Sequence, residues 1–402
     1  MILSHRIALD PTMKQRRYFA QAAGCARFVW NWALDAWNRD YGAGGKPSAM
    51  KLRKTFNTIK YQQYPWMRNI HRDCHSQPFA NLQKAFVGFF KKIAKRPKFH
   101  ARGRHDSFYV ANDRLCLSHD GWVVHLPLIG QIRMHEQLRF KGWIMGATVS
   151  RTADRWFIAI QVEVERTERQ RTGNGIAGAD WGLKSALVIT READGQTTTE
   201  AIAPPKPLKN ALRKLCRMQR SVSRRTKGGS NRRNLVQKVA RVHAHVASIR
   251  ADFWHKIATR LCRENQAVGI ENLNVAGMLK NRRLSRAIVD VGCHEFRRQM
   301  DYKSKLYGTH LFLADPWYPS SKTCSRCGTV KKVLGLGDRV FCCDQCGHVQ
   351  DRDANASVNL CHAAKASLYP RLEGNSRLRR GKAVSSLAEA GTTPGCSQPL
   401  IK

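Results

Sequence analysis

The chain has 402 residues, enough for two or three domains, and 42% of them are hydrophobic, as in ordinary globular proteins. Its 70 Lys and Arg outnumber 29 Asp and Glu, and the resulting formal net charge of +41 indicates a nucleic-acid partner. The chain has no apolar run of about 18 residues that could span a membrane. Charged residues interrupt the N-terminus too early for a signal peptide. We therefore expect a cytoplasmic protein that binds no membrane and no small-molecule substrate.

The first hundred residues are predicted to form one strand and two helices. The opening SHRIALDPT alternates apolar and polar residues like an edge strand and stops at Pro11. Apolar residues recur at helical spacing from Lys14 to Trp37, and again from Gln77 to Ile93, where most of them are phenylalanines expected in the core. The basic run KKIAKRPK that follows is a better candidate for phosphate contacts.

The middle of the chain changes pattern twice. Between Ser107 and Glu165 the period is two, with Gly and Asp at the breaks, which predicts a small β-domain. Farther on, apolar residues at alternating spacings of three and four predict an antiparallel helical hairpin around the turn KGGSN. Almost no acidic residue is interleaved with the basic ones on its outward faces, so we expect these to contact phosphates. They are Arg213, Lys214, Arg217, Arg220, Arg224, Arg225, Arg232, Arg233, Lys238 and Arg241.

Five of the thirteen cysteines fall within a short window, which is the pattern of a metal site rather than of a disulfide framework. Cys324 with Cys327, and Cys343 with Cys346, form two C-x2-C pairs, each followed directly by a glycine that suits a tight turn. We predict that these four thiolates hold one structural Zn²⁺, because four protein ligands leave no open coordination position. Cys342 is placed outside the site, although a register through it stays open. The segment between the pairs alternates enough to predict a short hairpin.

Acidic residues end two apolar segments that are far apart in the chain. Asp180 ends the predicted strand IAGAD before a tight turn, and Glu271 ends a second short apolar run. Directly after the cysteine cluster, a predicted helix begins with the acids of DRDAN, Asp351 and Asp353. Phosphodiester hydrolysis by two metal ions needs converging carboxylates, and hard oxygen ligands select Mg²⁺ or Mn²⁺. These residues predict a shared site without choosing between Asp351 and Asp353.

Most of the chain resembles the TnpB family, the OrfB type of transposon-encoded RNA-guided nuclease, which is related to the type V CRISPR effectors. The resemblance runs through QRRYFAQAAGCARFVWNWAL, FANLQKAFVGFFKK, PKFHARGRHDSFYV, GADWGLKSAL, RRTKGGSNRRN, GIENLNVAGMLKN, WYPSSKTCSRCG and CCDQCGHVQDRDANASVNL. In this family the second acid of the last motif is the ligand. The resemblance therefore implies that Asp180, Glu271 and Asp353 are the catalytic residues and bind the Mg²⁺ ions.

The fold class implied is an α+β multidomain protein with a RuvC/RNase H-like α/β nuclease core and an inserted zinc ribbon. An N-terminal helical domain and a small β-barrel-like domain complete it. The expected boundaries are 1–12 and 103–172 for the β-barrel-like wedge domain, 13–102 for the helical recognition domain, 173–314 and 351–371 for the nuclease domain with its hairpin at 206–260, and 315–350 for the zinc ribbon. The composition of 372–402 predicts a disordered tail.

The function implied is that of an RNA-guided DNA endonuclease of a bacterial insertion sequence. It would bind a guide RNA from the transposon end and hydrolyse matching double-stranded DNA next to a short flanking motif. One alternative is a nuclease-inactive RNA-guided DNA-binding repressor, but such proteins typically lose the acidic triad that is present here. The other is a transposase acting directly on transposon ends, for which no His-hydrophobe-His pair with a separate tyrosine nucleophile stands out.

Overall fold

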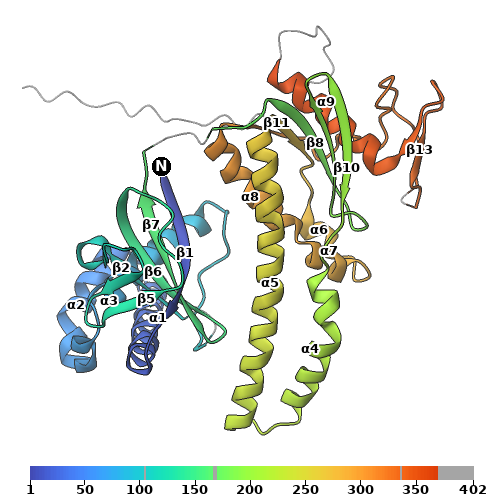
Figure 1. Cartoon of the computed structure of the whole chain (residues 1–402). Coiled ribbons are helices and arrows are strands. Elements are labelled where there is room, and N and C mark those ends of the chain that lie inside the picture. Colours follow the sequence, from blue (N-terminus) through green and yellow to red (C-terminus); the bar gives the residue numbers. More distant parts are fainter. Residues whose placement is uncertain (104–105, 166–169, 336, 370–402) are drawn as a thin grey trace, which may run out of the picture. The chain divides into compact units, whose positions relative to one another are not determined.

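The computed structural model describes residues 1–103, 106–165, 170–335 and 337–369, so the predicted tail at 372–402 lies outside the described residues. The chain divides into two compact units, and each is described by itself. Within the described ranges, the first unit comprises Met1–Thr167 and Leu215–Ala244, and the second comprises Glu168–Lys214 and His245–Lys402. Figure 1 shows their elements in chain order. No helix in the described part of the chain is long and apolar enough to cross a membrane.

The first unit contains an antiparallel sheet of seven strands in the order β2-β6-β7-β1-β5-β4-β3. The strands are β1 (Ile2–Asp10), β2 (Ser107–Ala111), β3 (Cys116–Leu117), β4 (Val123–Leu126), β5 (Gly130–Met134), β6 (Trp143–Thr152) and β7 (Arg155–Glu163). The prediction of an edge strand at the N-terminus is wrong, because β1 pairs with both β7 and β5. The alternation of apolar and polar residues shows only that one face of β1 is buried, as Ile7 and Leu9 are. It does not show whether other strands pair with the two edges of β1.

The same unit contains the α-helices α1 (Met13–Gly42), α2 (Ala49–Gln63) and α3 (Asp73–Phe90). A short 3-10 helix, η1 (Pro65–Asn69), precedes α3. Helix α1 begins at a capping box formed by Thr12 and Gln15, and Phe19 packs its buried face against Phe108 and Trp156 of the sheet. Sequence periodicity missed α2, because only three of its residues are buried and its apolar stripe is short.

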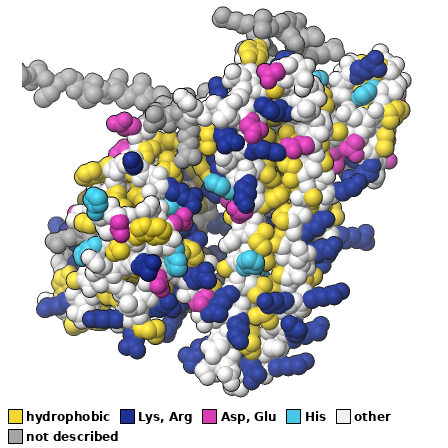
Figure 2. All heavy atoms as spheres, in the orientation of Figure 1, with side chains coloured by type: hydrophobic (Ala, Val, Ile, Leu, Met, Phe, Trp, Pro, Cys, Tyr) yellow, Lys and Arg dark blue, Asp and Glu magenta, His cyan; other side chains and the backbone are white. Residues whose placement is uncertain are grey.

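Helices α4 (Pro207–Ser223) and α5 (Ser230–Glu264) form where the hairpin is predicted, and they run in opposite directions around residues 224–229 (Figure 1). Lys and Arg side chains project along both helices on the face shown in Figure 2. Arg241 pairs with Asp154 in the turn between β6 and β7, at 2.6 Å. The other basic residues of the hairpin face are mostly exposed, as a surface for phosphates requires.

The second unit is built on a five-stranded sheet in the order β10-β9-β8-β11-β12. Strands β8 (Gly175–Trp181), β9 (Leu187–Ala193) and β10 (Gln196–Ile202) are antiparallel, whereas β11 (Asn265–Ile270) and β12 (His310–Leu313) run parallel to β8. Helix α9 (Arg352–Leu368) lies directly on β8 and β11. A Cβ at Gly178 or Gly269 would overlap the α9 backbone at Ser357 or Leu360, so both glycines are required for this close approach.

Helices α6 (Val275–Met278), α7 (Ser285–Val291) and α8 (Cys293–Tyr307) connect β11 to β12. A separate two-stranded ladder pairs β13 (Val340–Cys342) with β14 (Val349–Asp351). The predicted hairpin between the two cysteine pairs is therefore misplaced, because β13 finds its partner beyond the second pair. A single bridge, Thr323 with Val330, flanks the first pair in the same way.

Candidate functional site

The ends of β8 and β11 bring two acidic residues together. Ala179 of β8 pairs with Ile270 of β11, so Asp180 and Glu271 continue the same register. Neighbouring strands lie about 4.8 Å apart, and paired residues of parallel strands point to the same face. The face is the one under α9, because Ile176, four residues before Asp180, belongs to an apolar cluster with α9. Two acids distant in sequence thus become neighbours at the carboxyl edge of the sheet.

Helix α9 contributes the third acid from its first turn. Asp353 lies four residues before Ser357 and seven before Leu360, the positions that meet β8 and β11. Its carboxylate lies beside Gly182, and its charge raises the pKa of Asp180. Asp353 therefore faces the other two acids.

Asp351 does something different from Asp353. It is the N-cap of α9, where its Oδ1 accepts hydrogen bonds from the backbone N–H groups of Asp353 and Ala354 at 3.0 and 3.1 Å. A carboxylate at this position satisfies two amide groups that the helix leaves unbonded and complements the helix dipole. The geometry thus separates the two acids that sequence spacing left equivalent.

The carboxylates of Asp180, Glu271 and Asp353 repel one another, and those of Asp180 and Glu271 are mostly buried. Burial raises the pKa of Asp180 well above its usual range, and the charges of Glu271 and Asp353 raise it further. Burial also raises the pKa of Glu271, although a hydrogen bond from Ser320 Oγ at 2.6 Å opposes the shift. The charge of Arg352 favours ionisation of both. An all-carboxylate donor set with this mutual repulsion fits Mg²⁺ or Mn²⁺.

This repulsion predicts that Asp180→Asn stabilises the protein when divalent cations are absent. Because the pKa of Asp180 is raised on folding, the wild-type protein loses stability as pH rises from the carboxyl's ordinary range through the raised value. At pH 8 without Mg²⁺, the variant should melt higher, by about 2–4 °C for each kcal/mol recovered. The gap should shrink near pH 4 or when Mg²⁺ is added. Asp351→Asn is the control, and equal melting temperatures for wild type and Asp180→Asn at pH 8 would count against mutual repulsion.

Four cysteines form the second cluster of possible metal ligands. The sulfur atoms of Cys324, Cys327, Cys343 and Cys346 all lie within 4.8 Å of one another, with 3.7 Å from Cys324 to Cys346 and 3.6 Å from Cys327 to Cys343. A tetrahedral Zn²⁺ with Zn–S bonds of about 2.3 Å separates its sulfur ligands by about 3.8 Å, so the cluster fits zinc. Cys342 is not part of it.

The two cysteine pairs repeat one local geometry. After each pair, Gly328 and Gly347 adopt positive φ angles of 76° and 67°, which a glycine reaches without strain. Their N–H groups bond back to the carbonyls of Cys324 and Cys343 at 2.9 and 3.1 Å. These turns point both thiolates of each pair to one side, which explains the glycines that follow the C-x2-C motifs.

Sequence reasoning missed the polar side chains that join the cysteine cluster to the acids. Asn355 and Asn359 of α9 are buried, and both Nδ2 groups donate to the carbonyl of Thr323 at 2.7 Å, one residue before Cys324. Asn359 Nδ2 also donates to the carbonyl of Ser320 at 2.7 Å, and Ser320 Oγ donates to Glu271. Polar residues on the buried side of a helix were the signal that could have revealed this link.

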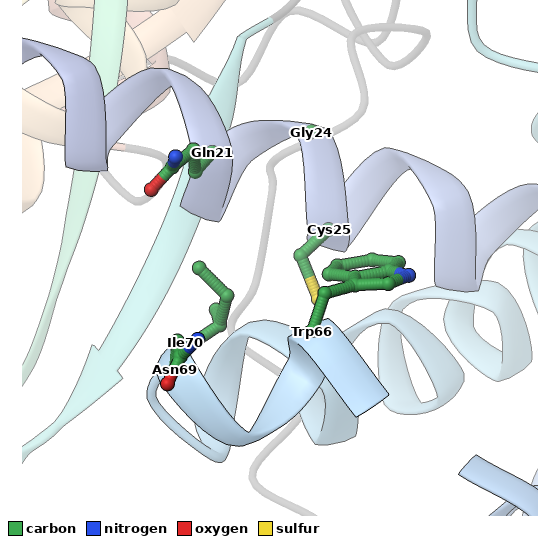
Figure 3. A pocket seen from close by; sticks show the side chains of 6 residues that line it. All are labelled: Gln21, Gly24, Cys25, Trp66, Asn69 and Ile70. Atoms are coloured by element: carbon green, nitrogen blue, oxygen red, sulfur yellow. The ribbon is translucent and has the colours of Figure 1, made fainter. Parts of the chain in front are cut away.

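A pocket in the first unit has different chemistry. It has a volume of about 350 Å³ and lies between α1 and η1, where Gln21, Gly24, Cys25, Trp66, Asn69 and Ile70 line it (Figure 3). Burial raises the pKa of the Cys25 thiol to about 12, so this cysteine is not a ready nucleophile. The pocket is lined by no acidic residue, and it adds nothing to the candidate site.

Three family models match parts of the chain. Residues 159–282 match OrfB_IS605, described as a probable transposase, and residues 294–360 match the Cas12f1-like TNB domain. Residues 1–46 match a helix-turn-helix domain, although this range holds strand β1 and one long helix, α1. Because each match spans less than half of the chain, relatives of full length decide the family.

A TnpB-like protein of Acanthamoeba polyphaga mimivirus is 25% identical over 46% of this chain and 36% of its own length. A protein of Streptomyces pristinaespiralis, provisionally named an RNA-guided DNA endonuclease, is 36% identical over 89% of this chain and 88% of its own length. The chain belongs to the TnpB family. InsQ of Escherichia coli, with the same provisional name, is 28% identical over 90% of this TnpB chain and 92% of its own length.

Solved structures show the same fold class. The structure of Cas12f1 with sgRNA and target DNA superposes on this TnpB chain with a TM-score of 0.57 at 13% identity, covering 87% of this chain and 83% of that one. A likeness at this identity shows the fold alone, which is mixed α+β in both proteins.

Proposed function

We propose that this TnpB protein is an RNA-guided DNA endonuclease of a bacterial insertion sequence and acts in the cytoplasm. Its guide RNA would come from the transposon end, and its target would be matching double-stranded DNA beside a short flanking motif. The observation that carries the proposal is the meeting of Asp180, Glu271 and Asp353, from three distant segments, in a chain of net charge +41. The provisional names of the Streptomyces and Escherichia relatives support it.

The sheet of the second unit supports a RuvC/RNase H-like core. Three antiparallel strands are followed by two parallel ones, and α9 covers the central strand β8 and its neighbour β11. In the proposal, Asp180, Glu271 and Asp353 hold two Mg²⁺ or Mn²⁺ ions, which would activate water and stabilise the leaving oxygen. The residues of this chain fix the three carboxylates at one sheet edge, and Ser320 orients Glu271 through its hydrogen bond.

The zinc ribbon, in this proposal, is the segment that carries the four cysteines between β12 and α9. Zn²⁺ there would be structural, because all four ligand positions belong to thiolates. Asn355 and Asn359 of α9 donate hydrogen bonds to this segment. These bonds support a fixed position of the ribbon beside the acids.

The basic surface supports guide RNA and target DNA as partners. Sequence recognition by base pairing leaves the protein to contact phosphates, and the exposed Lys and Arg of α4 and α5 suit that contact (Figure 2). A polar pocket of about 290 Å³ between α3 and strands β2, β6 and β7 is a candidate for reading the flanking motif. Gln77, Asn81 and Lys84 of α3 line it together with Tyr109 and Thr148.

The proposal is tested by co-expressing the protein with RNA from its transposon end and adding matched DNA with Mg²⁺. We expect cleavage of matched DNA, none of DNA with a scrambled target, and a loss of at least about 10³-fold in Asp180→Ala, because a metal clamp contributes several kcal/mol. Binding without cleavage by the wild-type protein would favour the RNA-guided repressor instead. Cleavage of transposon ends without any RNA would favour a transposase.

A further inference from the structure

Trp317 is unusually open to solvent for a large apolar side chain. It is 89% exposed, the highest value among the large hydrophobic side chains of the described residues. Within residues 310–329 it is the one exposed large hydrophobic side chain. Indole rings are usually well buried, which makes this placement informative.

The turn that carries Trp317 is ordered by its own hydrogen bonds. The Asp315 carboxylate accepts the Trp317 backbone N–H at 2.9 Å, and the Tyr318 N–H donates to the Asp315 carbonyl at 2.9 Å. Pro316 and Pro319 further restrict the backbone on both sides. The backbone that presents the indole is therefore ordered before a ligand binds, so little backbone entropy is lost when a ligand stacks on the ring.

Both ends of this turn are fixed beside the three acids. Before it, the Ala314 N–H donates to the Ile270 carbonyl at 3.0 Å, and Ile270 directly precedes Glu271. After it, Ser320 Oγ donates to Glu271 at 2.6 Å. Trp317 is three residues from Ser320, so their Cα atoms are at most about 10 Å apart. The exposed indole thus lies at most a few nucleotides' length from the carboxylates.

We propose that Trp317 is a stacking surface for an unpaired nucleobase of the DNA strand that is presented to Asp180, Glu271 and Asp353. This inference rests on the proposed nuclease function for the identity of the strand. An indole face stacks on any base without sequence preference, as a nuclease whose target is chosen by base pairing requires. Stacking beside the acids would hold the backbone of a single strand in place while its phosphodiester meets them.

The experiment measures binding of a short single-stranded DNA that contains the fluorescent base 2-aminopurine. The protein carries Asp180→Ala to prevent cleavage and is purified with its guide RNA. We expect Trp317→Ala and Trp317→Leu to weaken binding about 5- to 100-fold and to remove the quenching of 2-aminopurine, because the stacked face is lost. Trp317→Phe should keep most of both. Trp143→Ala, which removes a 66% exposed indole from the first unit, should bind like the parent protein.

The inference is overturned if Trp317→Ala binds and quenches like the parent, or if Trp317→Leu behaves like Trp317→Phe. An RNA oligonucleotide of the same sequence that binds more tightly, with the same dependence on Trp317, would overturn the assignment to the DNA strand. Failure of the nuclease proposal is separable, because the wild-type protein would then not cut matched DNA while Trp317-dependent binding of single strands remained.

Discussion

Asp353→Ala should abolish cleavage of matched DNA, while Asp351→Ala should leave most of it. Asp353 faces Asp180 and Glu271, so its loss removes part of the proposed metal clamp and should cost at least about 10³-fold in rate. Asp351 caps α9, and loss of an N-cap costs about 1 kcal/mol of stability. The measurement is single-turnover cleavage with saturating guide complex and Mg²⁺.

Asparagine variants at the same two positions separate charge from capping. Asp351→Asn keeps a capping side chain and should cut at close to the wild-type rate, whereas Asp353→Asn keeps the shape of the carboxylate and should still fail. Binding of matched DNA, measured without Mg²⁺, should survive in all four variants. If Asp351→Asn lost cleavage and Asp353→Asn retained it, the roles assigned from the geometry would be reversed.

The choice of Asp353 was within reach of sequence reasoning. Ser357, Leu360, Cys361 and Ala364 follow Asp353 by four, seven, eight and eleven residues, the spacing of one helix face. All four are small or apolar and buried under the sheet. Reading the face of the helix, in addition to its first residue, would have selected Asp353 from physical pattern alone.

The meeting of Asp180 with Glu271 could not be predicted in the same way. A one-residue shift of register between Asn265 and Ala267 sets their pairing, and without it Glu271 would lie opposite Trp181. Such a shift depends on which neighbouring strand and helix are packed together, and no local propensity records it. The strands themselves were predictable from their apolar runs, whereas their register was not.

Among the other failures were a helix that buries few residues and a strand that is paired at both edges. Helix α2 buries too little for periodicity to reveal it, and β1 alternates although both of its edges are paired. The ladder of β13 with β14 joins residues on either side of a cysteine pair, so the metal site determines it more than β-propensity does. Sequence patterns predict which residues are buried better than they predict which distant segments pair.

The second large effect should follow from loss of zinc. Cys343→Ser should release Zn²⁺, because a structural site holds its metal through all four thiolates, and metal binding supplies much of the folding free energy of so small a segment. The carbonyls of Thr323 and Ser320 accept hydrogen bonds from Asn359 of α9, so the ribbon's fold and the position of Ser320 are coupled. Since Ser320 holds Glu271, unfolding of the ribbon should reach the acids and lower cleavage by at least about 10²-fold.

Cys342→Ser is a closely matched control, because Cys342 is adjacent to Cys343 in the chain but lies outside the cluster of four sulfurs. Cys342→Ser should retain one zinc per chain by elemental analysis and should cut matched DNA normally. Cys343→Ser should lose both the zinc and the cleavage activity. Asn359→Ala tests the connection itself: the zinc content should stay at one per chain while cleavage falls, because the ribbon folds but loses the two hydrogen bonds that Asn359 donates to it. Zinc loss in Cys342→Ser with retention in Cys343→Ser would move the second pair by one residue. Normal cleavage by a zinc-free Cys343→Ser protein would show that the acids do not depend on the ribbon.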